Sequence, residues 1–243
     1  MPDSAVPEDV KRKLEEKQRP YEFDAEELKN RGFKTSMYKD AWDDVQKDYD
    51  KYIKGFNLNQ FDDEIEKNTK NVGIKINKKN IHSTVNGLRI EYEGDNEFVL
   101  HRTFRKGVVD HDFFTIADNL QGGGFSKDVF KSLYKQYQNV GIERINVHAN
   151  LEVGGYTWAK YGFSALAREY TNIDYLAHRK LNSVDYDDFS RWLSKCKGKD
   201  IPLHEVSKRT YFKDMMLGSD WHGYINLADQ AQKDVFENYL FKR

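Results

Sequence analysis

The sequence predicts an α/β (α+β) protein with a mixed, mostly antiparallel central sheet flanked by helices. Between residues 72 and 117, apolar and polar residues alternate in several short stretches, which is the period of half-buried strands. An amphipathic helical pattern follows at 125–140, and a charged helical pattern precedes the sheet. We therefore expect a charged helical N-terminal arm (1–70), a core domain (71–165) and a helical C-terminal extension (166–243) whose late strand completes the sheet.

Composition limits the classes of function. The chain has 243 residues and a formal net charge of −1, so it lacks the basic field of a dedicated nucleic-acid binder, and nucleic acid is an unlikely partner. Charged residues make up 33% of the chain, which favours an exposed or partner-dependent appendage. Its single cysteine, Cys196, excludes an internal disulfide and fits a reducing compartment.

The sequence contains no apolar run near the roughly 20 residues that cross a bilayer. It begins without the hydrophobic region of a signal peptide. We therefore expect a cytoplasmic protein without membrane contact. Packaging in a virus particle stays open as an alternative.

Two helices are expected in the N-terminal arm. Pro7-Glu8-Asp9 places a proline and two acids where a helix through Lys17 would begin. The second helix, 41–56, carries apolar residues at helical spacing. The arm is either a solvated helical segment or one that docks on a partner or on a second copy of the chain.

The strands of the core follow one another closely. Short turns such as Glu93-Gly94-Asp95-Asn96 separate them, and short connections favour antiparallel neighbours. The expected strands are 72–76, 88–92, 98–104 and 108–117.

The second half of the core alternates helix and strand. The helix at 125–140 ends at Gly141, as expected for a glycine just past a helix end. A strand at 142–148 and a short helix at 153–161 follow. In the extension we expect a helix at 183–196 capped by Ser183, a strand at 221–227 and a closing helix at 231–241.

A glycine-rich loop carries the clearest chemical signal. In Gln121-Gly-Gly-Gly124-Phe-Ser126, three glycines stand at the first turn of a predicted helix. Glycine leaves no Cβ in the way, so an anion can reach the free N–H groups and the positive end of the helix dipole. This chemistry suits a pyrophosphate. The P-loop pattern G-x-x-x-x-G-K-[ST] is absent, which argues against a nucleoside triphosphatase.

The same residues resemble the [Q/R]-x-x-G-x-[G/A] loop of the GCN5-related N-acetyltransferases (GNAT). Gln121 and Gly124 fit this pattern, whereas Ser126 replaces the usual Gly or Ala. The downstream strand, Asn150, short helix and Gly162-Phe163 resemble the second signature of that family. Together the motifs cover about 50 of the 243 residues.

The resemblance implies a coenzyme A site between two diverging strands. Acetyl-CoA would be the co-substrate, held largely by backbone groups, with an amine of a small molecule or protein as acceptor. The implied cofactor-binding residues are Phe114, Ile116, Gln121, Gly122, Gly123, Gly124, Phe125, Ser126 and Asn150.

The expected catalytic positions match the family pattern less well than the glycine loop does. The family often uses, as general acid, a Tyr four residues before the Gly of Gly-Phe, and Trp158 stands there. An indole cannot act as an acid at neutral pH. Tyr156 and Tyr161 flank this position and are candidate substitutes, with ordinary packing as the alternative interpretation.

Two residues are candidate bases. Asp112 lies on the strand that leads into the loop, where family members often place an acidic base, and a solvated strand end is the alternative. His148 closes the next strand, and histidine is a common general base, although the alternative of a hydrogen-bonded structural histidine is favoured. With one cysteine and scattered histidines, no ligand spacing suggests a metal.

Two functions remain open at this stage. The first is an acyl-CoA-dependent N-acyltransferase. The second is a non-catalytic structural or interaction protein, for example a virion-associated one, that reuses the fold and self-associates through residues 1–70. Trp158 and the charged arm favour the second, and the Gly154-to-Phe163 segment also resembles domains of bacteriophage virion proteins and secreted bacterial effectors.

Overall fold

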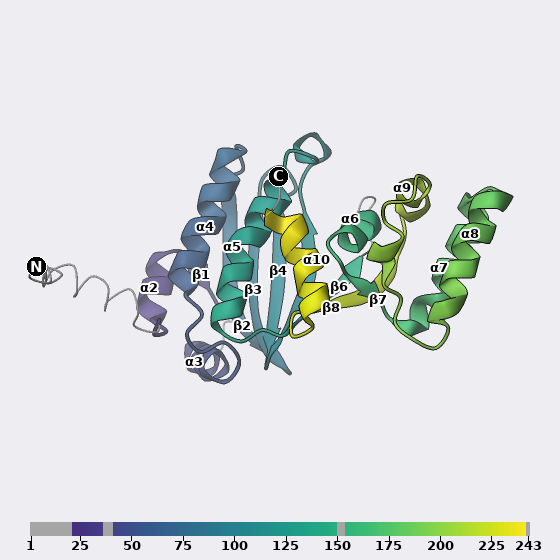
Figure 1. Ribbon diagram of the computed structural model, residues 1–243. Coiled ribbons are helices and arrows are strands. Elements are labelled where there is room, and N and C mark those ends of the chain that lie inside the picture. Colours follow the sequence, from purple (N-terminus) through teal and green to yellow (C-terminus); the bar gives the residue numbers. More distant parts are fainter. Residues whose placement is uncertain (1–20, 36–40, 150–153, 242–243) are drawn as a thin grey trace, which may run out of the picture.

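A computed structural model describes residues 21–35, 41–149 and 154–241. Within these residues the chain forms a mixed α/β fold around one open sheet in the order β1-β2-β3-β4-β5-β6-β8-β7 (Figure 1). The strands are β1 (Phe33–Lys34), β2 (Ile76–Thr84), β3 (Gly87–Gly94), β4 (Val99–Arg105), β5 (Val108–Thr115), β6 (Arg144–Ala149), β7 (Ser164–Ala165) and β8 (Trp221–Asn226).

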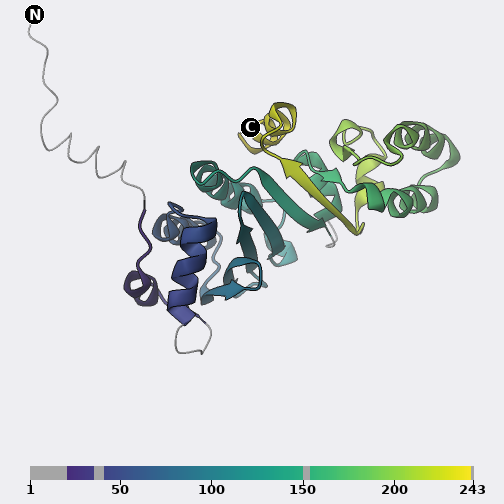
Figure 2. The same ribbon diagram turned by 90° about the horizontal axis from the view of Figure 1, so that it is seen from below.

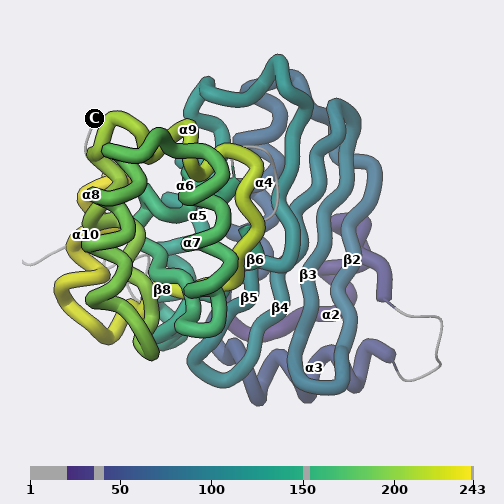
Figure 3. Tube along the Cα trace, turned by 90° about the vertical axis from the view of Figure 1, so that its right-hand side faces the viewer, coloured from purple at the N-terminus to yellow at the C-terminus, as the bar shows by residue number. Residues whose placement is uncertain are grey.

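The sheet is mostly antiparallel, as predicted. Strands β2 to β5 form a meander, because each pairs antiparallel with the next. The β5–β6 pair is parallel, and β8 then lies antiparallel between β6 and β7. Figure 3 shows β2 to β6 side by side in this order. The late strand at the predicted position therefore does join the sheet.

Helices cover one face of the sheet. Helices α4, α5 and α10 lie next to one another in front of the strands in Figure 1, and Figure 2 shows the yellow α10 beside the teal α5. The helices are α2 (Ala25–Asn30), α3 (Ala41–Tyr52), α4 (Leu58–Asn71), α5 (Phe125–Asn139), α6 (Gly154–Lys160), α7 (Tyr170–Lys180), α8 (Ser183–Leu193), α9 (Phe212–Met216) and α10 (Gln230–Phe241).

Side-chain alternation in the meander explains this one-sided cover. In β3, Leu88, Ile90 and Tyr92 are fully buried, whereas the intervening residues are partly exposed. Strand β4 repeats the pattern, but its buried side includes a charged residue, Arg102. Period-2 alternation therefore places an apolar face under the helices and a polar face toward solvent.

The described part of the N-terminal segment differs from a solvated arm over residues 41–71. Helix α3 runs below β2 and β3 in Figure 3 and contacts both strands. Helix α4 packs against α5, and its Phe61 and Ile65 are fully buried. Apart from the buried Asp62 of α4, the charged residues of these helices lie on their outer faces, so their apolar stripes belong to the main core. The expected helix through Lys17 lies outside the described residues.

Two boundaries in the chain needed correction. Helix α4 continues to Asn71, so the expected strand at 72–76 is wrong and β2 begins only at Ile76. The N-cap of α8 is Asn182, whose side chain accepts from the backbone N–H of Asp185, and Ser183 is the first helical residue. Asparagine and serine both favour an N-cap, and their adjacency made the choice ambiguous.

The C-terminal extension contains more structure than its sequence pattern indicated. Helices α7 and α8 pack against each other at the end of the molecule opposite α2 (Figures 1 and 2). Short 3₁₀ turns occur in the loop after β5 and within the extension. They are η1 (Asp118–Leu120) in the loop, and η2 (Ala167–Glu169), η3 (Ser194–Cys196) and η4 (Leu203–Glu205) in the extension. Among the described residues, none of the helices is long and apolar enough to cross a membrane.

Candidate functional site

Two neighbouring strands separate at the centre of the sheet. Parallel pairing of β5 with β6 runs from Val108 opposite Arg144 to His111 opposite Val147, and ends there. Strand β5 nevertheless continues to Thr115 and stays paired with β4. The register with β4 shifts at this point, which leaves Asp112 as the extra residue of a β-bulge. A bulge bends its strand and increases the local twist, so it accounts for the divergence of β5 from β6.

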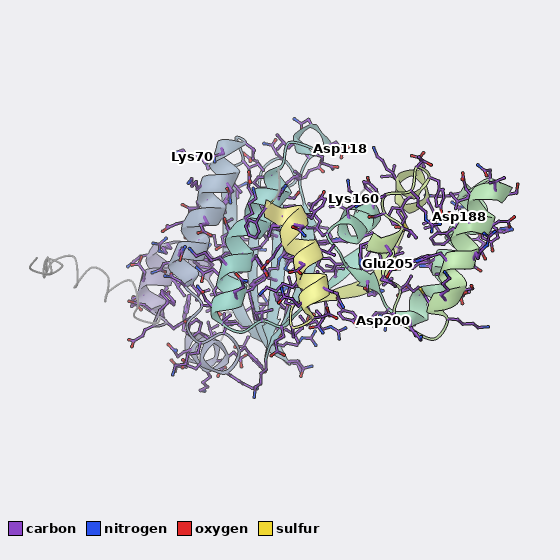
Figure 4. The ribbon with its side chains drawn as sticks, in the orientation of Figure 1. Lys70, Asp118, Lys160, Asp188, Asp200 and Glu205 are labelled. Atoms are coloured by element: carbon purple, nitrogen blue, oxygen red, sulfur yellow. The ribbon has the colours of Figure 1, made fainter. Side chains whose placement is uncertain are left out.

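A cleft of about 660 Å³ opens where the strands diverge. Its walls are the end of β5, the glycine loop, the first turn of α5, helix α6, and side chains from α9 and α10. Asp118 and Lys160, labelled in Figure 4, mark the loop after β5 and helix α6. The volume falls in the range of small-molecule and cofactor sites.

The cleft collects most of the residues singled out in the sequence. Its lining includes Asp112, Phe114, Ile116, Gln121, Gly122, Gly124, Phe125, Ser126, His148, Tyr156 and Tyr161. Gly123 is not among the lining residues, and Asn150 lies outside the described residues. The structure thus brings the candidates together, while their roles stay predictions.

The glycine loop has the backbone that an anion site requires. Gly122 and Gly124 adopt φ angles of 79° and 87°, which favour glycine. A Cβ added at either position would meet no atom within 4 Å, so the space over both residues is open. Gly124 is the N-cap of α5 and supplies no side-chain cap. The backbone amides at the start of the helix therefore face open space at its positive end, which suits an anionic ligand.

Gln121 supports the loop from within. Its side-chain amide donates to Asp118 Oδ1 at 2.8 Å and to the backbone oxygen of Ile116 at 3.4 Å. These bonds tie the two ends of the η1 turn together. The side chain therefore shapes the loop, and the amide nitrogen is already engaged within the protein.

Aromatic side chains form the floor of the cleft. Phe114 stacks on Phe125 with ring centroids 6.1 Å apart, and it also contacts Phe130. Phe125 is 4% exposed, so it contributes core packing in addition to lining the cleft. An apolar floor beside the positive end of a helix suits a ligand with one charged end and one less polar end.

Helix α6 forms the wall opposite the loop. Tyr161 is 2% exposed, and burial raises the pKa of its hydroxyl, which hydrogen-bonds Ser126. This bond links the end of α6 to the first turn of α5. Trp158 packs against Phe130 and Phe163 at 5.2 and 4.9 Å between ring centroids. Tyr156, half-buried, is the tyrosine of α6 that lines the cleft without deep burial.

The two candidate bases lie on either side of the diverging strands. Asp112 is exposed and accepts a 2.7 Å hydrogen bond from the Thr103 hydroxyl. His148 is also exposed, and its Nε2 lies 2.8 Å from Asp220 Oδ1. Both therefore have polar partners and access to water, which suits proton transfer to or from a ligand.

A buried polar network, which sequence analysis did not predict, lies beneath the cleft. His111 lines the cleft, is 4% exposed, and places its Nε2 2.9 Å from the Tyr137 hydroxyl. The fully buried Arg102 guanidinium donates to the backbone oxygens of His101 and Phe113. It also interacts with the Tyr137 hydroxyl, although its Nε and Nη2 form no hydrogen bond with the part of the chain that the structure describes.

This network assigns the proton of His111. A guanidinium can only donate, so the Tyr137 oxygen accepts from Arg102 and keeps its own proton available for His111 Nε2. Burial, with the nearby Arg102 charge, holds the pKa of His111 well below its usual value, so the ring is neutral. The ring proton is then on Nδ1, which is buried and has no partner within the described residues.

The C-terminal extension supplies cleft residues that sequence analysis missed. Lys213 and Leu217 reach the cleft from the α9 region, and Tyr239 reaches it from α10. The Tyr239 ring lies 4.3 Å from the ring of Tyr161. These residues are far from the glycine loop in sequence, and no local pattern could have revealed their proximity to it.

Comparison with known proteins adds no assignment. No family model matches the chain, and no curated protein and no solved structure is significantly similar to it. Function must therefore be argued from the site alone.

Proposed function

We propose that this protein is an acyl-CoA-dependent N-acyltransferase of GNAT type. The observation that carries the proposal is the open glycine loop at the start of α5, placed at one end of a cleft between diverging strands. The backbone amides of the loop suit the pyrophosphate of coenzyme A. Beyond His111, the edge of β5 that faces β6 has no strand partner among the described residues, which suits the amide groups of a pantetheine arm.

The reaction in this proposal is transfer of an acyl group from a thioester to an amine. The amine nitrogen attacks the carbonyl carbon, an oxyanion forms, and the carbon–sulfur bond breaks with departure of the thiolate. Asp112, exposed at the bulge, is placed to accept the amine proton, directly or through water. His111 Nδ1–H is a neutral donor beside the cleft, which suits stabilisation of the oxyanion.

Of the aromatic residues in and just after α6, Tyr156 remains as the candidate acid that protonates the leaving thiolate. Trp158 has no acidic proton for this purpose, and burial raises the pKa of Tyr161, whose hydroxyl is engaged with Ser126. Tyr156 is half-buried and lines the cleft, so the proposal gives it this role.

The first test measures acetyl-CoA binding by isothermal titration calorimetry. Wild-type protein should bind, and Gly124→Glu should lose binding by at least about 100-fold, because it places charge and bulk where the pyrophosphate sits. Gly198→Glu is the matched control. Gly198 has a similar φ of 75° and equally open surroundings, but it lies outside the cleft, so the control should bind like wild type.

Two results would contradict the binding site. One is no heat with wild-type protein at millimolar acetyl-CoA, and the other is normal binding by Gly124→Glu.

A second function is favoured by Trp158. If the chain binds acetyl-CoA but transfers no acyl group to any of a panel of amines, the non-catalytic interaction protein becomes the better proposal. Light scattering then decides whether the chain self-associates, as that alternative expects.

A further inference from the structure

Two histidines face each other across neighbouring strands at the rim of the cleft. His148 on β6 is the direct cross-strand partner of His222 on β8. Their rings are nearly parallel, at 9°, with centroids 4.0 Å apart. Both side chains are partly exposed, at 39% and 44%. Two imidazoles held this closely repel each other once both are protonated, so the arrangement needs carboxylates or a shared cation.

Two carboxylates meet this pair from different segments. Asp220 Oδ1 lies 2.8 Å from His148 Nε2. Glu169 Oε1 lies 3.2 Å from His222 Nδ1, and the Glu169 side chain is only 12% exposed. Asn172 steadies both, because its amide donates to the Asp220 backbone oxygen at 2.6 Å and contacts Glu169 Oε2 at 3.4 Å.

We propose that His148, Asp220 and His222 bind a divalent transition metal ion of the Zn²⁺ class. One donor atom from each residue lies within 4.8 Å of the other two. Zn–N and Zn–O bonds of about 2.0–2.1 Å in a tetrahedron place ligand atoms about 3.3 Å apart. Rotation of these partly exposed side chains would bring the ligand atoms to that spacing.

The carboxylate of Glu169 fits the outer part of such a site. A carboxylate that accepts from Nδ1–H of His222 fixes the tautomer in which Nε2 is free for the metal, which is the usual outer-shell arrangement of zinc-bound histidines. His148 can provide Nε2 in the same way once its ring proton moves to Nδ1 and Asp220 turns from hydrogen-bond acceptor to metal ligand.

The ligand count indicates the type of site. Three protein ligands leave one tetrahedral position for water or a ligand, as in catalytic rather than structural zinc sites. His148 also lines the cleft, so the ion would lie at its rim. The binding proposal depends only on the His148–Asp220–His222 group and does not require coenzyme A binding.

Titration of metal-free, full-length protein with Zn²⁺ tests the site, with Co²⁺ as an optical probe of tetrahedral coordination. Wild-type protein should bind one Zn²⁺ per chain saturably at pH 7.5, and more weakly at pH 5.5, because protons compete with the metal for nitrogen ligands. Asp220→Asn and His222→Asn should each weaken binding by more than about tenfold, and Glu169→Gln by about tenfold.

His101→Asn provides the matched control. His101 also belongs to a histidine–carboxylate group, with Glu91 and Glu93, but Arg89 Nε already binds Glu91 there at 2.7 Å. This variant should bind Zn²⁺ like wild type. Circular dichroism of every variant separates loss of ligands from loss of fold.

The proposal is overturned if folded wild-type protein takes up no Zn²⁺ at 100-fold excess over protein. It is equally overturned if His101→Asn, but not His222→Asn, removes binding. Acetyl-CoA affinity measured on the same variants separates this site from the proposed acyltransferase function. The metal-site variants should lose Zn²⁺ binding and keep acetyl-CoA binding.

Discussion

At the scale of single residues, the unusual feature is a charged and titratable network inside the apolar face of the sheet. Arg102 and His111 alternate in phase with buried aliphatic residues of β4 and β5, and both are at least 96% buried. Burial lowers the pKa of both side chains. A buried cation without a carboxylate partner costs stability, and such cost concentrates at functional sites. The network lies directly under the proposed cleft.

The first consequence concerns the dependence of stability on pH. Folding holds His111 neutral, beside Arg102 and Tyr137, whereas the unfolded chain protonates it below the usual pKa of 6.5. The unfolded state thus binds more protons as the pH falls, and native stability decreases below about pH 6.5. Between pH 7.5 and 5.5, wild type should lose on the order of 1 kcal/mol more than His111→Gln in urea unfolding.

Other histidines do not obscure this comparison. Burial also lowers the pKa values of His101 and His204, but both residues are present in wild type and variant, so their contributions cancel. Equal losses in the two proteins would show that His111 is protonated in the folded state, and the assignment of its proton to Nδ1 would fail.

Some of this detail was accessible from the sequence. Strand alternation in the sequence puts His111 and Asp112 on opposite faces, and the burial of His111 and the exposure of Asp112 agree with this. Glycine chemistry singled out the loop. The buried network itself was not predictable, because Tyr137 is separated from Arg102 by 35 positions and only the packing of α5 on the sheet joins them.

At the scale of elements, strand β8 carries His222 of the proposed metal site and pairs with β7, the strand at the edge of the sheet. Gly223 lies between Trp221, which is fully buried, and the short edge strand β7. A Cβ on Gly223 would lie 2.3 Å from the backbone oxygen of Ser164 and 2.5 Å from the Trp221 ring. A backbone atom cannot turn aside, so this contact requires glycine.

Gly223→Ala should therefore destabilise the protein by about 1–3 kcal/mol, the usual cost of overpacking. The measurement is urea unfolding followed by far-UV circular dichroism. Gly123→Ala is the control, because its Cβ would meet nothing closer than the Leu120 backbone oxygen at 3.7 Å. If both variants unfold at the wild-type midpoint, β7 and β8 do not approach each other as closely as described.

Elements with strong periodicity were the ones that sequence analysis located. Helix α5 and strands β3, β4, β5 and β8 fall where the patterns placed them. Strand β2 was missed because a lysine takes a buried position in it: Lys79 lies on the same face as the fully buried Ile81 and pairs there with Asp62, which masks the alternation. Sequence analysis assigned the residues of helix α4 to the charged N-terminal arm, because the apolar stripe of this helix is narrow and its remaining surface is acidic and basic.

At the scale of the whole molecule, the two ends of the chain have different tasks. The described N-terminal helices α3 and α4 complete the hydrophobic core on the β2–β5 half of the sheet. The C-terminal extension completes the cleft, because it adds β8 beside β6 and brings α9 and α10 to the cleft wall. Sequence patterns could suggest that the extension was helical, but which walls it formed depended on contacts between distant residues.

The closing helix α10 gives the last prediction. Tyr239 lies 4.3 Å from Tyr161 and 5.7 Å from the Nζ atoms of Lys127 and Lys160, measured to ring centroids. Two cation–π contacts of about 0.5–1 kcal/mol each hold these lysines near the first turn of α5. If acetyl-CoA binds at the glycine loop, Tyr239→Ala should weaken its affinity about tenfold in calorimetric titration. Phe241→Ala in the same helix is the control, because Phe241 is 54% exposed and does not line the cleft. Equal affinities for both variants would mean that α10 closes the fold without contributing to the binding site, and the cleft would then belong to the core domain alone.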